Sequence, residues 1–210
     1  MSSPIQLVFF DIGGVLVHAD LERYVHLGIG LFGASPEAFR REVVARVPDL
    51  ERGRLDSVTF WKEVGESLWI RGEGRPAPPE LCRHLWRDLL ASTVEVDPQV
   101  MNLCQLLREK GLRLGALTNT LEDHIPVLTA LGVYRPFDPC VMSCRQGHRK
   151  PEREIYLKAA ELAGLKPRSC LLVDDLEENI EGARRAGMPG VRYTGVQDLL
   201  RELVRLRVLS

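Results

Sequence analysis

The stretch LVFFDIGGVLV, residues 7–17, decides the fold of this chain of 210 residues. Four large apolar residues lead into a single carboxylate, Asp11, and the glycines Gly13 and Gly14 follow one residue later. A short, continuous apolar run bounded by glycines is typical of a strand that is buried on both faces of a sheet. A carboxylate at the end of such a strand is costly to bury, so the charge of Asp11 calls for compensation.

The composition is that of a globular protein with a large core, because 45% of the residues are hydrophobic and 27% are charged. The formal net charge of −1 gives no indication of a nucleic-acid or membrane partner. The apolar runs are shorter than a membrane span, and the N-terminal stretch lacks the pattern of a secretion signal, so we expect a cytoplasmic location. The five scattered cysteines are expected to be reduced structural thiols.

From residue 97 onward, helix and strand patterns alternate. Asp97 and Pro98 are typical of the first positions of a helix. Strand-like apolar runs lie at residues 112–118, 140–144 and 170–173 and near Val191. This alternation predicts an α/β fold with a Rossmann-like parallel sheet, in which residues 7–10 form the first strand.

Residues 18–92 interrupt this alternation with helical patterns and a Gly/Pro-rich joint at residues 71–80, and no convincing strand is found there. We therefore expect an inserted α-helical cap at residues 18–92 and an α/β core formed by residues 1–17 and 93–210. The tryptophans of the cap are expected to pack in its interior. Arg52 and Arg54, on either side of Gly53, are expected in a solvated loop, with contact to a substrate as the alternative.

Polar side chains follow three of the predicted strands. They are Asp11, the pair Thr118 and Asn119, and the pair Asp174 and Asp175. Ligands of open parallel sheets bind outside the carboxyl ends of the strands, so these side chains are expected to form one site.

The chain resembles the haloacid dehalogenase-like (HAD) superfamily, most closely the subgroup of glucose-1-phosphate phosphatases and the phosphatase domain of soluble epoxide hydrolases. The resemblance covers residues 5–17 and 97–193 and extends weakly into the cap at the stretch ERGRLDSVTFWKEV. Four motifs carry it, in order along the chain: Asp11–Val15, Leu117–Asn119, Lys150–Pro151, and Asp174–Asp175 with Asn179.

The resemblance implies a phosphatase that works through a phosphorylated aspartate. Asp11 would be the nucleophile, because a carboxylate attacks phosphorus and divides one difficult displacement into two easier ones. Lys150 would neutralise the nucleophile and the phosphate. The Thr118 hydroxyl and the Asn119 backbone amide would hold phosphate oxygens, and Gly14 would let the backbone approach closely.

The resemblance also implies a bound Mg²⁺, which prefers oxygen ligands. Its ligands would be the Asp11 side chain, the Gly13 carbonyl and Asp175, with Asp174 bound directly or through water. Asn179 would orient Asp175 or have no such role. The cation would also compensate the buried charge of Asp11.

Gly13 stands where most phosphatases of the superfamily carry a second aspartate, which protonates the leaving group and later activates water. General acid–base help is worth roughly 10²–10⁴ in rate. Either the substrate has a good leaving group, as glycosyl, acyl and aryl phosphates have, or another residue supplies the proton. The candidates for that residue are His18, Asp20, Arg54 and Asp56.

The sequence thus predicts a Mg²⁺-dependent phosphatase of a small phosphorylated metabolite, such as a sugar 1-phosphate. One alternative is a 2-haloacid dehalogenase, which needs no metal; the paired acids Asp174 and Asp175 argue against it. The other is a weakly catalytic scaffold that binds phosphorylated ligands. Taken singly, Asp11 could be a helix cap and Lys150 a surface lysine. The substrate and the oligomeric state are left open.

Overall fold

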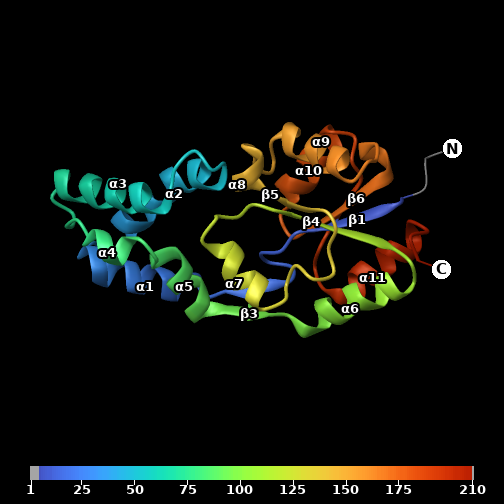
Figure 1. Ribbon diagram of the computed structural model, residues 1–210, viewed down its shortest axis with the longest axis horizontal. Coiled ribbons are helices and arrows are strands. Elements are labelled where there is room, and N and C mark those ends of the chain that lie inside the picture. The colour runs from blue at the N-terminus through green and yellow to red at the C-terminus, as the bar shows by residue number, and fades with distance from the viewer. Residues whose placement is uncertain (1–4, 210) are drawn as a thin grey trace.

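A computed structural model describes residues 5–209 of the chain. Its core is a parallel sheet of five strands in the order β5-β4-β1-β6-β7, so the first strand of the chain lies in the middle (Figure 1). The predicted α/β fold with a Rossmann-like parallel sheet is confirmed. The strands are β1 (Leu7–Phe10), β4 (Arg113–Thr118), β5 (Cys140–Met142), β6 (Cys170–Asp174) and β7 (Gly190–Arg192).

Strand β1 is buried on both faces, as its continuous apolar run predicts. Val8 and Phe10 belong to the hydrophobic cluster on one face of the sheet, and Leu7 and Phe9 belong to the cluster on the other. Phe9 is paired in register with Gly115 of β4. A Cβ atom at Gly115 would lie 2.5 Å from the Phe9 ring, so this register requires a glycine.

Helices cover both faces of the sheet (Figure 1). Residues of α6 and α11 pack in the cluster around Phe10, and residues of α9 and α10 pack in the cluster around Phe9. Asp97 caps α6 as predicted, accepting hydrogen bonds from the backbone amides of Gln99 and Val100. The core helices are α6 (Pro98–Glu109), α7 (His124–Ala130), α8 (Ser143–Gln146), α9 (Arg153–Leu162), a 3-10 turn (Pro167–Ser169), α10 (Glu177–Arg185) and α11 (Val196–Arg205).

The inserted cap consists of five helices that lie beside the core, at the end of the molecule away from the two termini (Figure 1). The tryptophans Trp61 and Trp86 pack in its interior as predicted, with ring centroids 4.8 Å apart, whereas Trp69 is 64% exposed. The cap helices are α1 (Leu21–Phe32), α2 (Pro36–Glu51), α3 (Ser57–Ile70), α4 (Pro79–Cys82) and α5 (Leu85–Thr93).

A two-stranded antiparallel ribbon joins the cap to the core. It pairs β2 (Val17–Ala19) with β3 (Val94–Val96). The expectation that residues 18–92 hold no strand was therefore wrong at its N-terminal edge, because a strand of three residues is too short to show an alternating pattern. The boundaries of the core at 17 and 93 stay a prediction.

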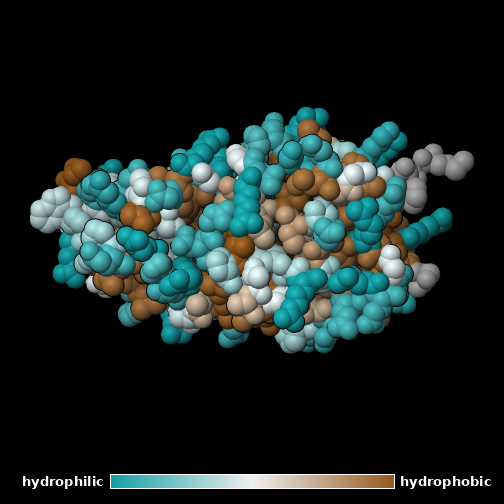
Figure 2. Space-filling view, viewed as in Figure 1, coloured by the Kyte–Doolittle hydropathy of each residue, from teal (hydrophilic) through white to brown (hydrophobic). Residues whose placement is uncertain are grey.

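The surface is mixed in character. In Figure 2, hydrophilic side chains cover much of the visible face over both the cap and the core, and apolar residues are exposed in small groups between them. None of the helices within residues 5–209 is both long enough and apolar enough to cross a bilayer. The five cysteines, all within the described range, are free thiols as expected.

Candidate active site

The predicted site residues meet at the carboxyl ends of three neighbouring strands. Asp11 directly follows β1, Thr118 ends β4 and Asp174 ends β6, and β1 lies between the other two strands. Carboxylate oxygens of Asp11, Asp174 and Asp175 lie within 4.8 Å of one another. The backbone amide of Asp11 donates to the Val173 carbonyl at 2.8 Å, which fixes the nucleophile candidate against β6.

Lys150 bridges two of these carboxylates. Its Nζ atom lies 2.8 Å from Asp11 Oδ1 and 2.6 Å from Asp174 Oδ2. The residue is only 1% exposed, so it is not the surface lysine that its position before a proline would suggest in isolation. A buried ammonium is stable when it is paired in this way with carboxylates.

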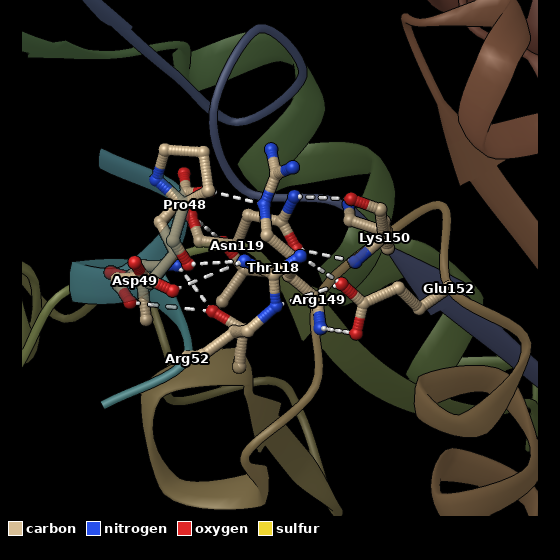
Figure 3. A network of polar contacts seen from close by, with 11 residues as sticks. Pro48, Asp49, Arg52, Thr118, Asn119, Arg149, Lys150 and Glu152 are labelled. Atoms are coloured by element: carbon tan, nitrogen blue, oxygen red, sulfur yellow. Dashed lines mark hydrogen bonds and ion pairs between the residues drawn. The ribbon is translucent and has the colours of Figure 1, made fainter. Parts of the chain in front are cut away.

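The side chain of Asn119 positions the backbone of Lys150 (Figure 3). The Lys150 amide donates to Asn119 Oδ1 at 2.8 Å, and Asn119 Nδ2 donates to the Lys150 carbonyl at 3.0 Å. Sequence reasoning assigned Asn119 only a backbone role toward phosphate. The two paired residues lie 31 positions apart in the sequence. The sequence feature that could have indicated this role is an amide side chain directly after a strand.

The side chain of Asn179 is hydrogen-bonded to Asp174, not to Asp175. Its Nδ2 atom donates to Asp174 Oδ1 at 2.9 Å, and the Leu176 amide donates to the same oxygen at 3.0 Å. Of the two alternatives for Asn179, orienting Asp175 or having no such role, the structure therefore favours the second. Asn179 lies on the first turn of α10 and faces back over the buried residue Asp174, while Asp175 is only partly buried and faces Gly14.

Gly14 allows Asp175 to approach the first loop. Its φ angle is +74°, in the left-handed region, and a Cβ atom there would lie 2.6 Å from Asp175 Cγ. Gly13 differs, because a Cβ atom at that position would meet no heavy atom within 4 Å. Gly13, Gly14, Thr118 and Asn119 all line one cavity together with Asp175. The Thr118 hydroxyl makes only a long bond of 3.4 Å to the Asn119 carbonyl.

Charge and donor chemistry fit a divalent cation. Three carboxylates and one ammonium leave the cluster with an excess of negative charge, and two of the three acids are buried. Their donors are oxygens, which suit Mg²⁺. Without a cation, burial raises the pKa of Asp11 to about 7, a net value that includes the opposing charge of Lys150 and the added rise from Asp174. A bound dication would favour the ionised nucleophile.

Lys150 stays charged in this environment. Burial by itself would lower its pKa, but the carboxylates of Asp11 and Asp174 together raise it above the ordinary value for lysine. The pKa of Asp175 is raised, first by burial and then by the charge of Asp174. The site therefore holds a permanent positive charge beside the nucleophile and an acidic pair whose charge a cation would stabilise.

The end of cap helix α2 is bonded to the loop that carries Lys150 (Figure 3). Arg149 Nε donates to Glu51 Oε2 at 2.5 Å, and Arg52 Nε donates to Glu152 Oε1 at 2.8 Å. Arg52 is 20% exposed in this ion pair. Arg52 was expected in a solvated loop, with a substrate contact as the alternative. The structure instead shows it in an ion pair that joins the cap to the core next to the site.

Two of the four candidate proton donors serve as helix caps. Asp20 accepts from the Arg23 amide at the start of α1, and Asp56 accepts from the Thr59 amide at the start of α3. Arg54 is an exposed residue whose guanidinium lies 3.7 Å from an Asp49 oxygen. His18 lies on β2 and lines the same cavity as Gly13. The structure thus favours His18 among the four candidates.

The chain belongs to the haloacid dehalogenase-like hydrolase family, whose model matches residues 5–187. Glyceraldehyde 3-phosphate phosphatase of Methanopyrus kandleri is 39% identical over 130 residues, which span 60% of this chain and 56% of that protein. Phosphoglycolate phosphatase of Escherichia coli strain K12 is 33% identical over 202 residues, which span 89% of this chain and 80% of that protein.

Solved structures agree on the fold. A HAD family enzyme of Bacteroides thetaiotaomicron in complex with magnesium and inorganic phosphate has a TM-score of 0.75 at 22% identity, over 93% of this chain and 98% of that one. L-2-haloacid dehalogenase of Xanthobacter autotrophicus has a TM-score of 0.64 at 21% identity, over 96% and 83%. The predicted family is confirmed, and the predicted subgroup stays a prediction.

Proposed function

We propose that this protein is a Mg²⁺-dependent phosphatase that hydrolyses a small phosphorylated metabolite through an aspartyl-phosphate on Asp11. The observation that carries the proposal is the cluster of three carboxylates within 4.8 Å, two of which Lys150 bridges. Family membership and the phosphatase relatives support phosphatase activity. The identity of the nucleophile, the ligand set and the substrate are the further content of the proposal.

Asp11 attacks phosphorus with one carboxylate oxygen. Within the described residues, the hydrogen bonds from Lys150 and from the Ile12 amide both go to Oδ1, which leaves Oδ2 for the attack. The new Oδ2–phosphorus bond forms as the bond from phosphorus to the ester oxygen breaks. The ester oxygen departs with the electron pair and is protonated as the alcohol. Water then attacks the phosphoaspartate, which releases inorganic phosphate and restores the carboxylate.

The other residues hold charge in place during both steps. Lys150 offsets the negative charge of Asp11 and of the entering phosphate. The Thr118 hydroxyl and the Asn119 amide lie at the end of β4, where they can donate to phosphate oxygens. Asp11, Asp174, Asp175 and the Gly13 carbonyl would hold Mg²⁺, which when bound neutralises the phosphoryl oxygens.

Gly13 restricts the substrates that this machinery can use efficiently. Glycine cannot transfer a proton, so esters with good leaving groups are favoured, among them the sugar 1-phosphates suggested by the sequence and the aryl phosphates. Hexose 6-phosphates, whose leaving group is an ordinary alkoxide, should be hydrolysed more slowly than the corresponding 1-phosphates.

Hydrolysis of p-nitrophenyl phosphate tests the proposal, because its leaving group needs no acid. We expect turnover with Mg²⁺, loss of turnover with EDTA and its recovery when excess Mg²⁺ is added back. Asp11→Asn should be inactive in every condition. Equal rates for the wild type and Asp11→Asn would contradict the role of Asp11. Metal-independent release of halide from 2-chloropropionate would favour the dehalogenase alternative.

A further inference from the structure

A large cavity extends from the candidate active site into the cap. Its volume is about 690 Å³, within the range of sites that enclose an organic ligand. On the core side it is lined by Gly13, Thr118, Asn119 and Asp175, which belong to the site described above. A substrate whose phosphate is attacked by Asp11 would therefore place its organic part in this cavity.

The cap lines this cavity mostly with apolar side chains. Val43 and Val47 of α2 line it, together with the aromatic residues Phe39, Trp61 and Trp86. Phe39 and Trp61 are stacked at 6.1 Å, and Trp86 lies edge-on to the His124 ring at 5.8 Å. The three aromatic side chains are themselves nearly buried, so they support a wall whose accessible surface is apolar, and such a wall suits an apolar organic group.

The same walls offer little to a sugar or to a second acidic group. Among the described residues that line the cavity, Arg40 is the one arginine or lysine. Its guanidinium is already paired with Glu22 at 2.6 Å on the surface. A phosphorylated hydroxy acid would lack a free cation for its carboxylate, and the hydroxyls of a sugar would lose water without regaining enough hydrogen bonds.

A few polar atoms of the lining lack a protein partner. They are Nε1 of Trp61, Nε1 of Trp86, Nε2 of His124 and Oγ1 of Thr120, and each is buried. Because neighbouring side chains cover these atoms, they offer no hydrogen bond to a bound molecule, and the accessible wall of the cavity is mostly apolar. Burial also lowers the pKa of His124 to about 4, so its ring is neutral and adds no charge to the lining.

We infer that the substrate is an aryl phosphate whose organic part is an apolar ring system larger than a single benzene ring. This inference rests on the proposed function, because it takes the phosphate to be bound at Asp11. Gly13 supports it independently of the cavity: an aryl oxide leaves without a proton from the enzyme. The phosphorus–oxygen bond to the ring breaks, the aryl oxide takes a proton from water, and the products are inorganic phosphate and an aromatic alcohol.

The first test compares five esters by kcat/KM with Mg²⁺ present: phenyl phosphate, 2-naphthyl phosphate, n-octyl phosphate, glucose 1-phosphate and phosphoglycolate. We expect 2-naphthyl phosphate to exceed phenyl phosphate by at least about tenfold, because burial of the second ring adds apolar contact. It should also exceed the other three. A ratio near one would overturn the inference, and so would a higher value for octyl phosphate, glucose 1-phosphate or phosphoglycolate.

Variants of the cavity wall locate the preference. Val43→Asn and Val47→Asn introduce a polar group of similar size into the lining and should reduce the naphthyl-to-phenyl ratio about tenfold. Val58→Asn is the matched control, because Val58 is a partly exposed valine of the cap that does not line the cavity. An unchanged ratio in both lining variants would show that the ring binds elsewhere.

Binding to Asp11→Asn separates this inference from the proposed function. The variant should bind 2-naphthyl phosphate at least about tenfold more tightly than phenyl phosphate, measured by quenching of tryptophan fluorescence. If no ester, including p-nitrophenyl phosphate, is turned over by the wild type, the proposed function fails while this preference can still be observed. Turnover without any preference in rate or binding overturns only the aryl assignment.

Discussion

Replacing Gly13 with aspartate should convert the protein into a better phosphatase for alkyl phosphates. The position lies two residues beyond Asp11 and lines the substrate cavity. A Cβ atom there meets no heavy atom within 4 Å, and its φ lies outside the left-handed region that would strain a side chain. The new carboxyl group can therefore enter the space next to the reacting phosphate without displacing its neighbours.

The size of the effect follows from two opposing contributions. General acid catalysis is worth about 10²–10⁴ in rate, or about 3–5 kcal/mol of activation free energy. The added carboxylate also increases the negative charge around Asp11, Asp174 and Asp175, which weakens phosphate binding but raises its own pKa and so keeps it protonated. We expect the net gain to lie near the lower end, at about 10²-fold in kcat/KM for glucose 6-phosphate.

The assay compares glucose 6-phosphate with p-nitrophenyl phosphate in the wild type, Gly13→Asp and Gly13→Asn. The aspartate should raise kcat/KM for the sugar ester and change that for the nitrophenyl ester less than about threefold, since nitrophenolate needs no proton. Asparagine matches the shape but cannot transfer a proton, so it should give no gain. The reasoning is refuted if Gly13→Asn and Gly13→Asp behave alike, or if both esters gain equally.

Two further predictions concern the metal site and stability at low pH. Gly14→Ala should force the Asp175 carboxylate aside and raise the Mg²⁺ concentration needed for half-maximal activity by about tenfold or more. Gly13→Ala should leave that concentration nearly unchanged. Equal Mg²⁺ titrations for the two variants would exclude the steric argument. The pKa of His124 is lowered by burial from 6.5 to about 4, so below about pH 6.5 the unfolded chain takes up a proton that the folded chain does not, and stability is lost as the pH falls toward 4. From pH 7.5 to 5 this costs about 2 kcal/mol of unfolding free energy. Urea unfolding of His124→Gln should show a loss smaller by that amount, and His26→Gln, at an exposed position, should retain the wild-type loss.

The sequence was sufficient to locate the core strands along the chain and the residues at their ends, but not to give the order of the strands in the sheet. Strand β1 is buried on both faces, so its apolar run is continuous and easy to recognise. Glycines and prolines mark the ends of most helices. Helix α11 went unpredicted although it packs Leu199 and Leu203, four residues apart, against the core.

Contacts between distant segments could not be predicted from local patterns. Lys150 precedes a proline in a polar stretch, so the resemblance and not the local pattern placed it beside Asp11, and its contact with Asp174 was not expected. Arg52 and Glu152 are 100 residues apart, so their ion pair leaves no mark in either stretch. The structure requires a glycine at position 53, because its φ is +67° and a Cβ atom there would clash with the Cys144 carbonyl. The sequence alone could not distinguish that close approach from an ordinary turn.

The missing acid and the apolar cavity have a common physical basis. A carboxyl group at position 13 would lie at the edge of a mostly apolar cavity and close to three other acids, so its ionised form would be disfavoured. A substrate whose apolar ring leaves as a stable aryl oxide needs no such acid, and burial of the ring against the apolar cavity wall favours its binding. Glycine at position 13 therefore suits a substrate with an apolar, readily departing group, whereas a sugar alkoxide would need both the acid and a polar cavity. Thus Gly13 and the cap walls favour the same substrate chemistry, although they lie on different parts of the fold.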